Sequence, residues 1–123
     1  MLWIPLAGLV LMALSGCQPA EPEVSYAADV EPILRKYCVD CHAEGKSGYE
    51  ATGLSMESYE AVMKGTRYGP VVVPGDSFSS VLTMLIEGRA DPSIKMPHGD
   101  RRGPSAAEIK TLSSWVDKGA KNN

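Results

Sequence analysis

The chain has 123 residues, enough for one domain, and its 12 basic and 15 acidic side chains leave a formal net charge of −3. Charges of both signs are interspersed along residues 21–123. Because no basic stripe could neutralise a run of phosphates, nucleic acid is excluded as an expected partner.

The first segment has the composition of an export signal. Residues 1–16 carry no charged side chain and are mostly apolar, but they are fewer than the roughly 20 residues of a membrane-spanning helix. They end in Leu14-Ser15-Gly16, directly before Cys17, and this sequence resembles the lipobox of bacterial lipoproteins. We therefore expect a lipoprotein signal peptide and a lipidated Cys17. The alternatives are an ordinary signal peptide and an uncleaved apolar anchor, and both also export the domain.

Residues 17–26 are expected to form a lipid-anchored tether. Residues 18–23 are polar and rich in proline, a composition that favours an extended, semi-rigid chain. The domain itself, residues 27–121, is then expected on the periplasmic side of a bacterial membrane. Gln18 stands where an aspartate tends to retain lipoproteins at the inner membrane, so attachment to the outer membrane is favoured.

Hydrophobic spacing predicts the first helix of an all-α domain. Within residues 27–41, the apolar positions recur three and four residues apart, at Val30, Ile33, Leu34, Tyr37 and Cys41. We expect the helix to start near Asp29. Pro32 then lies in its first turn, where a missing N–H matters little.

The middle of the domain predicts a loop, a short helix and a second loop. Residues 43–53 are rich in glycine, serine and charged side chains, so they predict a loop. Residues 56–64 predict a short helix that ends at Gly65. Residues 65–77 combine glycine and proline around three valines, and we expect an extended loop.

Two more helices are expected after this loop. Asp76 or Ser77 is a suitable N-cap for a helix that runs to Ile86. Residues 89–104 then predict a long loop, and loops of this length inside a small domain usually have a function. Ser105 begins the last helix with the Ser-x-x-Glu pattern of a capping box.

Four short helices and long loops bury too little apolar surface for a domain of fewer than about 100 residues. Something else must therefore complete the core. The five-residue motif Cys38-Val39-Asp40-Cys41-His42, at the end of the first predicted helix, indicates which group completes the core.

The spacing of this motif is that of covalent haem attachment. Two thiols three residues apart on one helical turn can add to the two vinyl groups of a haem, and the next histidine then lies beneath the iron. We expect Cys38 and Cys41 to hold the haem and His42 to bind its iron through one ring nitrogen. The other ring nitrogen is expected to donate to a backbone carbonyl. The cofactor is thus expected to be one covalent haem c.

A Cys-x-x-Cys pair is also compatible with a redox-active dithiol, a zinc site or a structural disulfide. The dithiol lacks its usual βαβ context. A zinc site needs a fourth ligand beyond Cys38, Cys41 and a histidine, since Cys17 is assigned to the lipid. A disulfide is compatible with an exported protein, but it leaves the adjacent His42 unexplained.

The second axial ligand is expected in the long loop before the last helix. Met96 lies there beside Pro97, which stiffens the chain, and a thioether is a soft ligand suited to ferrous iron. His98 is the competing ligand, and an open distal position is the third possibility.

Further segments agree with one family pattern. They are Val30-Glu31-Pro32-Ile33-Leu34, Pro74-Gly75-Asp76 with Ser80-Val81-Leu82, Met96-Pro97, and Trp115-Val116-Asp117-Lys118-Gly119-Ala120. With the haem motif, they make residues 26–121 resemble the class I cytochromes c, most closely the short cytochrome c domains of planctomycetes and other bacteria. The resemblance implies the class I cytochrome c fold, with about four short helices and long loops around one covalent haem, and with His42 and Met96 on the iron.

The resemblance also implies that the first and last helices cross. In this chain the crossing would pack Ile33, Leu34 or Tyr37 against Leu112, Trp115 and Val116.

The expected function is electron transfer between redox proteins, a donor and an acceptor, without a small-molecule substrate and without catalysis. A different class is a haem sensor or haem enzyme subunit, which needs an open or His-ligated distal site; His98 is the residue that suits it. A third possibility is a tethered accessory subunit that serves one enzyme complex.

Overall fold

The computed structural model describes residues 16–123, and the predicted signal peptide lies outside this range apart from Gly16. The described chain consists of helices and loops without a β-strand, which confirms the all-α class. No helix in this part is long and apolar enough to span a membrane. In chain order the helices are η1 (Tyr26–Val30, a π-helix), α1 (Glu31–Tyr37), α2 (Ser47–Thr52), α3 (Tyr59–Lys64), α4 (Val81–Ile86), η2 (Pro92–Ile94, a 3-10 helix) and α5 (Ala106–Asp117).

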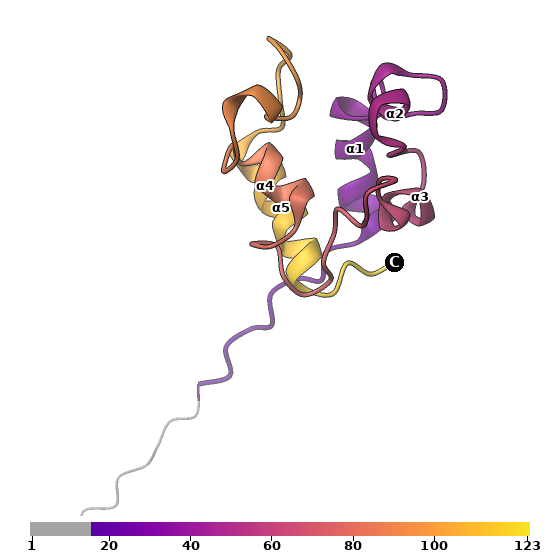
Figure 1. Cartoon of the computed structure of the whole chain (residues 1–123). Helices are drawn as coiled ribbons and strands as arrows, with labels where there is room; N and C mark the ends of the chain where they lie inside the picture. Colours follow the sequence, from indigo (N-terminus) through magenta and orange to yellow (C-terminus); the bar gives the residue numbers. More distant parts are fainter. Residues whose placement is uncertain (1–15) are drawn as a thin grey trace, which may run out of the picture.

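The helices form two groups that meet at one end of the molecule. Figure 1 shows α1, α2 and α3 on one side, and α4, α5 and the loop of residues 88–104 on the other. The groups are joined where α5 packs against η1. The extended N-terminal segment leaves from the same end, and the tip of the loop lies at the opposite end (Figure 1).

Hydrogen bonds fasten the C-terminal residue to the start of the first helix. The backbone N–H of Ala27 donates to the carbonyl oxygen of Asn123 at 3.0 Å, and the N–H of Tyr26 donates to the side-chain oxygen of Asn123 at 2.8 Å. The hydroxyl of Ser25 also donates to the Asn123 carbonyl at 2.8 Å. These bonds satisfy backbone groups that the first turn of a helix leaves without partners.

The first helix starts earlier than expected. The hydroxyl of Ser25 accepts from the N–H of Ala28, and the carboxylate of Asp29 accepts from the N–H of Ser25, so Ser25 rather than Asp29 is the N-cap. The N–H of Val30 reaches back five residues to Ser25, which gives η1 its wide π-helical turn. Pro32 follows, and since proline has no N–H to continue the usual ladder, the wider turn before it costs little.

Residues 43–53 were expected to form a loop, but they contain α2. None of the side chains of α2 is fully buried, so the apolar pattern of a packed helix is missing from the sequence. Its stability comes from elsewhere in the chain. The guanidinium of Arg67 donates to the carbonyls of Glu50 and Ala51 at 3.0 and 3.1 Å, which satisfies the C-terminal end of the helix.

The helix α4 starts later than the expected N-cap at Asp76 or Ser77. The carboxylate of Asp76 accepts from the N–H of Ser79 at 3.0 Å, so it closes a turn in front of the helix. Ser80 is the N-cap, but its hydroxyl accepts no hydrogen bond from the helix; it donates to the carbonyl of Asp76 at 2.8 Å. The side chains that were expected to begin α4 therefore order the chain that leads into Val81.

Two predicted boundaries are confirmed. The helix α3 ends at Gly65, although it starts a little later than expected, at Tyr59. The helix α5 begins after Ser105, whose hydroxyl accepts from the N–H of Glu108 while the Glu108 carboxylate accepts from the N–H of Ser105. This reciprocal pair is the predicted capping box.

One core cluster joins the two groups of helices. The residues expected at the helix crossing, Ile33, Leu34, Leu112, Trp115 and Val116, all belong to it. The closest packing of α5 against the first helical segment is with η1, however, where the rings of Tyr26 and Trp115 lie 5.6 Å apart. Tyr37 reaches α5 differently, through a hydrogen bond from its hydroxyl to Glu108 at 2.9 Å. The crossing therefore lies one or two turns closer to the N-terminus than expected.

Two tyrosines in this contact differ in the hydrogen bonding of their hydroxyls. Tyr59 packs edge-on against Tyr26 at 5.2 Å, and its hydroxyl donates to the carbonyl of Ala120 at 2.8 Å. The hydroxyl of Tyr26 is buried and has no hydrogen-bond partner among residues 16–123. Its burial, with a smaller effect from Glu31, raises the pKa of Tyr26 to about 12.

Replacing Tyr26 with phenylalanine is expected to leave the free energy of unfolding unchanged or to raise it by about 1 kcal/mol, because the variant no longer buries an unpaired hydroxyl. Tyr59→Phe is the matched control, and it is expected to lower the free energy of unfolding by about 1 kcal/mol because the bond to Ala120 is lost. Guanidinium unfolding of the haem-loaded protein at pH 7 measures both. Equal losses in the two variants would contradict the assignment.

The same pair of variants has a pH signature. The folded protein holds the proton of Tyr26 more tightly than the unfolded chain, whose tyrosines have a pKa near 10. The contribution of Tyr26 to stability is therefore constant below pH 10 and is lost as the pH rises toward 12. Between pH 10 and 12, the free energy of unfolding of Tyr26→Phe is expected to fall less with rising pH than that of the wild type.

Candidate functional site

A cavity of about 680 Å³ lies between the two groups of helices. Its size is within the range of about 300 to 1,000 Å³ that is typical of cofactor and ligand sites. One wall consists of the residues after α1 together with α2, and the other consists of α4 and the loop that contains residues 96–104. Most of the lining side chains are apolar, with a few polar groups among them. Such a wall suits a flat, largely apolar cofactor.

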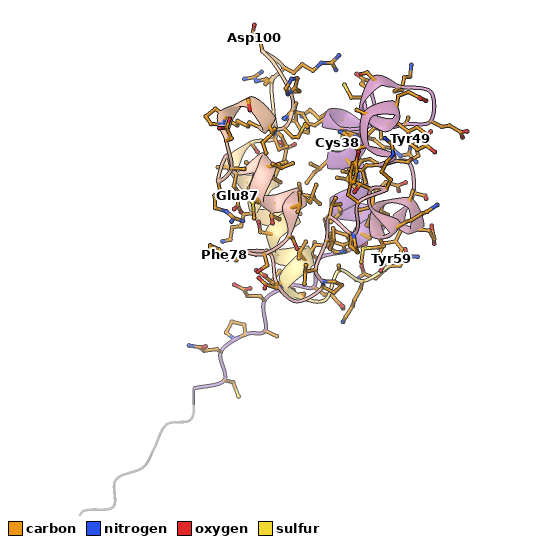
Figure 2. All side chains as sticks on the ribbon, viewed as in Figure 1. Cys38, Tyr49, Tyr59, Phe78, Glu87 and Asp100 are labelled. Carbon is orange, nitrogen blue, oxygen red and sulfur yellow. The ribbon has the colours of Figure 1, made fainter. Side chains whose placement is uncertain are left out.

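The predicted haem motif lines this cavity. The helix α1 ends at Tyr37, so the motif lies in the turn that follows the helix and not within it as expected. This turn keeps helix-like bonds, because the N–H of His42 donates to the carbonyl of Cys38 at 2.9 Å. Both thiols are free, half-buried and part of the cavity wall. Figure 2 shows Cys38 on the side of α1 that faces α4.

The electrostatics of Cys38 do not suit a redox-active dithiol. Burial, with a smaller effect from Cys41, raises the pKa of the Cys38 thiol to about 11. Catalytic dithiols need the opposite, a lowered thiol pKa that gives a reactive thiolate at neutral pH. The zinc alternative finds no support either, since no group of three or more His, Cys, Asp or Glu side chains that could hold a metal occurs within the described residues.

His42 is buried with its imidazole in the cavity wall. Only 8% of the residue is exposed, and its Nδ1 lies 3.3 Å from the carbonyl oxygen of Leu54. A carbonyl only accepts, so the bond requires the proton on Nδ1 and leaves the lone pair on Nε2. Burial lowers the pKa of His42, which favours the neutral ring, and the Leu54 carbonyl partly opposes this shift. A neutral imidazole with a free Nε2 is the form that binds a metal.

The loop on the other wall brings both candidate distal ligands to the cavity. Met96 is half-buried against the core, and its N–H lies 3.4 Å from the carbonyl of Leu85 at the end of α4. His98 also lines the cavity but is exposed. The buried Met56 lines it too, but its N–H donates to the carbonyl of His42 at 2.7 Å, which places Met56 on the wall of His42.

Three residues of the site were missed by sequence reasoning. Gly48 and Thr52 of α2 line the cavity, and Arg101 lines it from the long loop. Arg101 also lies 3.9 Å from the carboxylate of Asp40, inside the haem motif, so an exposed ion pair links the two walls. Nothing in the local sequence marks these residues, because each acts through a partner that the fold supplies.

Cys17, the predicted lipidation site, lies in the exposed extended segment that leads to the domain. Two lysines of the C-terminal region contact this segment. The ammonium of Lys118 donates to the carbonyl of Pro22 at 3.0 Å, and that of Lys121 pairs with Glu23 at 2.9 Å. The segment therefore joins the domain at the end where α5 and the C-terminus lie.

Comparison with known proteins identifies one family. Residues 38–100 match the family model described as Planctomycete cytochrome C, a span that begins at Cys38 and includes both Met96 and His98. The match confirms the resemblance seen in the sequence. No curated protein matches the chain. No solved structure matches it either.

Replacing Arg67 with alanine is expected to lower the free energy of unfolding by about 1 kcal/mol, because the carbonyls at the end of α2 lose their partner. Compared with the wild type, amide hydrogen exchange is expected to become faster in α2 and to change less in the rest of the protein. Arg102→Ala is the control, since Arg102 is an exposed arginine without a hydrogen bond in the described structure. Unchanged exchange in α2 after Arg67→Ala would show that the guanidinium does not hold this helix.

Proposed function

The chain belongs to the planctomycete cytochrome c family and therefore carries covalent haem c, and from this premise we propose that it is a one-electron carrier with a single haem in the cavity between α1 and α4. The observation that carries the proposal is the convergence of the Cys38 and Cys41 thiols, the His42 imidazole and the Met96 thioether on the same cavity.

The residues that line the cavity fit the cofactor. Cys38 and Cys41 are the thiols that attach the haem, and His42 offers Nε2 to the iron because Nδ1 is directed at the Leu54 carbonyl. Met96, on the opposite wall, would provide the second iron ligand. Apolar side chains from both walls exclude water from the faces of the macrocycle. The bound haem supplies a one-electron couple between ferrous and ferric iron.

A carrier would need a protein ligand on each side of the iron, so that no substrate binds there. His42 is held by its burial and by its carbonyl partner, and Met96 is held by core packing and by its contact with Leu85. The partners of such a site are other redox proteins, a donor and an acceptor, which meet the protein in short-lived contacts. No step in this mechanism transforms a small molecule.

A second candidate function is favoured by one specific observation, the presence of His98 on the same cavity wall as Met96. If His98 or no side chain at all faces the iron, the site becomes that of a haem sensor or of a haem enzyme subunit. Met96 is the better ligand because it is half-buried against the core, whereas His98 is exposed.

We also propose that the domain is exported and anchored to the bacterial outer membrane by a lipid on Cys17. The exposure of Cys17 and the extended chain after it support this. The segment enters the domain at the end opposite to the loop that carries Asp100, which Figure 2 shows at the tip. An anchor at Cys17 would therefore leave that loop directed away from the membrane.

The intact mass of the protein, produced with its haem maturation machinery and purified from membranes, is expected to equal the chain from Cys17 onward plus one haem and the lipid. Cys17→Ser is expected to lose the lipid and the membrane association while keeping the haem. The double variant Cys38→Ser with Cys41→Ser is expected to keep the lipid and lose the haem. A wild-type mass without haem would refute the site, and a mass without lipid would refute the anchor.

Met96→Ala is expected to remove the ferric absorption band that arises from Met-to-iron charge transfer. It is also expected to lower the reduction potential, because the soft thioether stabilises ferrous iron. His98→Ala is the matched control on the same loop and is expected to keep both. The optical spectrum and a redox titration measure the two properties. The reverse result, with His98→Ala altering the spectrum, would assign the distal position to the histidine.

A further inference from the structure

One backbone position of α2 lies unusually close to the ring of His42. A Cβ atom built on Gly48 would lie 2.8 Å from Cε1 and 2.9 Å from Nδ1 of His42, and 2.7 Å from the carbonyl oxygen of Cys41. All three distances are shorter than real Cβ contacts allow. Gly48 is not among the glycines with positive φ, so it is the space and not the backbone conformation that requires a glycine here.

The imidazole has little freedom to move away from Gly48. On its Nδ1 edge it contacts the Leu54 carbonyl at 3.3 Å, and the residue is buried. The backbone on both sides of the ring is tied to the same segment. The N–H of Tyr49 donates to the carbonyl of Cys41 at 3.1 Å, and the N–H of Met56 donates to the carbonyl of His42 at 2.7 Å. Residues 48–56 thus wrap around the histidine.

A single hydroxyl joins the two parts of this segment that touch the ring. The hydroxyl of Thr52 donates to the carbonyl of Gly48 at 2.7 Å and accepts from the N–H of Leu54 at 3.2 Å. A hydroxyl can do both at once because it has one proton and two lone pairs. Thr52 therefore connects Gly48, which packs against the imidazole, to Leu54, whose carbonyl accepts the hydrogen bond from Nδ1 of His42.

We propose that Gly48 and Thr52 are positioning residues for His42: Gly48 sets the plane of the imidazole by contact, and Thr52 holds the Leu54 carbonyl in place against Nδ1. The inference rests on the proposed role of His42 as an iron ligand. The bond from Nδ1 to a carbonyl makes the imidazole a stronger ligand, which favours ferric iron. Loosening the Leu54 carbonyl is therefore expected to raise the reduction potential.

The test uses the haem-loaded protein and two properties that a merely structural role does not move. Proton NMR of the ferric protein reports the plane of the axial imidazole through the order of the haem methyl shifts, and a redox titration reports the potential. Thr52→Val removes only the hydroxyl, and it is expected to change the methyl pattern and raise the potential. Thr52→Ser keeps the hydroxyl, and it is expected to show the methyl pattern and the reduction potential of the wild type. Gly48→Ala is expected to change the methyl pattern most, because the added methyl meets the ring.

Thr66 provides the matched control. It also lines the cavity, but its hydroxyl donates to the carbonyl of Gly69 at 3.1 Å, in the loop after α3. Thr66→Val removes a cavity hydroxyl of the same kind and is expected to leave the methyl pattern unchanged. If Thr52→Val behaves like Thr66→Val in both measurements, the positioning role is overturned, even where Gly48→Ala fails to take up haem.

The ferric spectrum of the wild-type protein tests the proposed function separately from the positioning role. A wild-type ferric spectrum without histidine on the iron would remove the proposed site, and the positioning role with it. A normal wild-type spectrum together with an unchanged Thr52→Val variant would leave the carrier function intact and remove the positioning role alone.

Discussion

The contact between η1 and α5 is the constraint on which the rest of the structure depends. It joins the two ends of the domain through Tyr26 and Trp115, and Asn123 adds hydrogen bonds to the first turn. Figure 1 shows the two groups of helices meeting at this end. The hydrogen bond from Tyr37 to Glu108 links them again near the end of α1. Further along the molecule, the two walls line a cavity of about 680 Å³. A domain of this size gains stability when an apolar cofactor takes the place of missing side chains.

The two walls of the cavity are held in different ways. The proximal wall is local in sequence, because residues 48–56 form backbone bonds with the motif directly before them. The distal wall is the loop of residues 88–104, which includes η2 and is fastened by fewer bonds, among them the contact of Met96 with Leu85. An exposed ion pair between Arg101 and Asp40 links the walls, and such pairs contribute little to stability. The geometry of the histidine is thus more strongly constrained than that of the distal ligand.

This difference has a chemical consequence for an electron carrier. A rigidly held histidine ligand moves little between the ferrous and ferric states, so the structure changes little during electron transfer. The distal residue decides whether the iron stays closed to small molecules. In this chain Met96 and His98 share one loop and one cavity, so the class of function turns on which of them faces the iron.

The sequence by itself determined the helical class, the haem motif, the capping box at Ser105 and the family, because each depends on residues close together in the chain. It also indicated that the core needed a cofactor. Only the tertiary structure decided that α2 exists, since its end is satisfied by Arg67 and not by a pattern of its own. The same holds for the contacts of Gly48 and Thr52 around His42. These depend on backbone groups brought together by folding, and no local propensity or spacing encodes them.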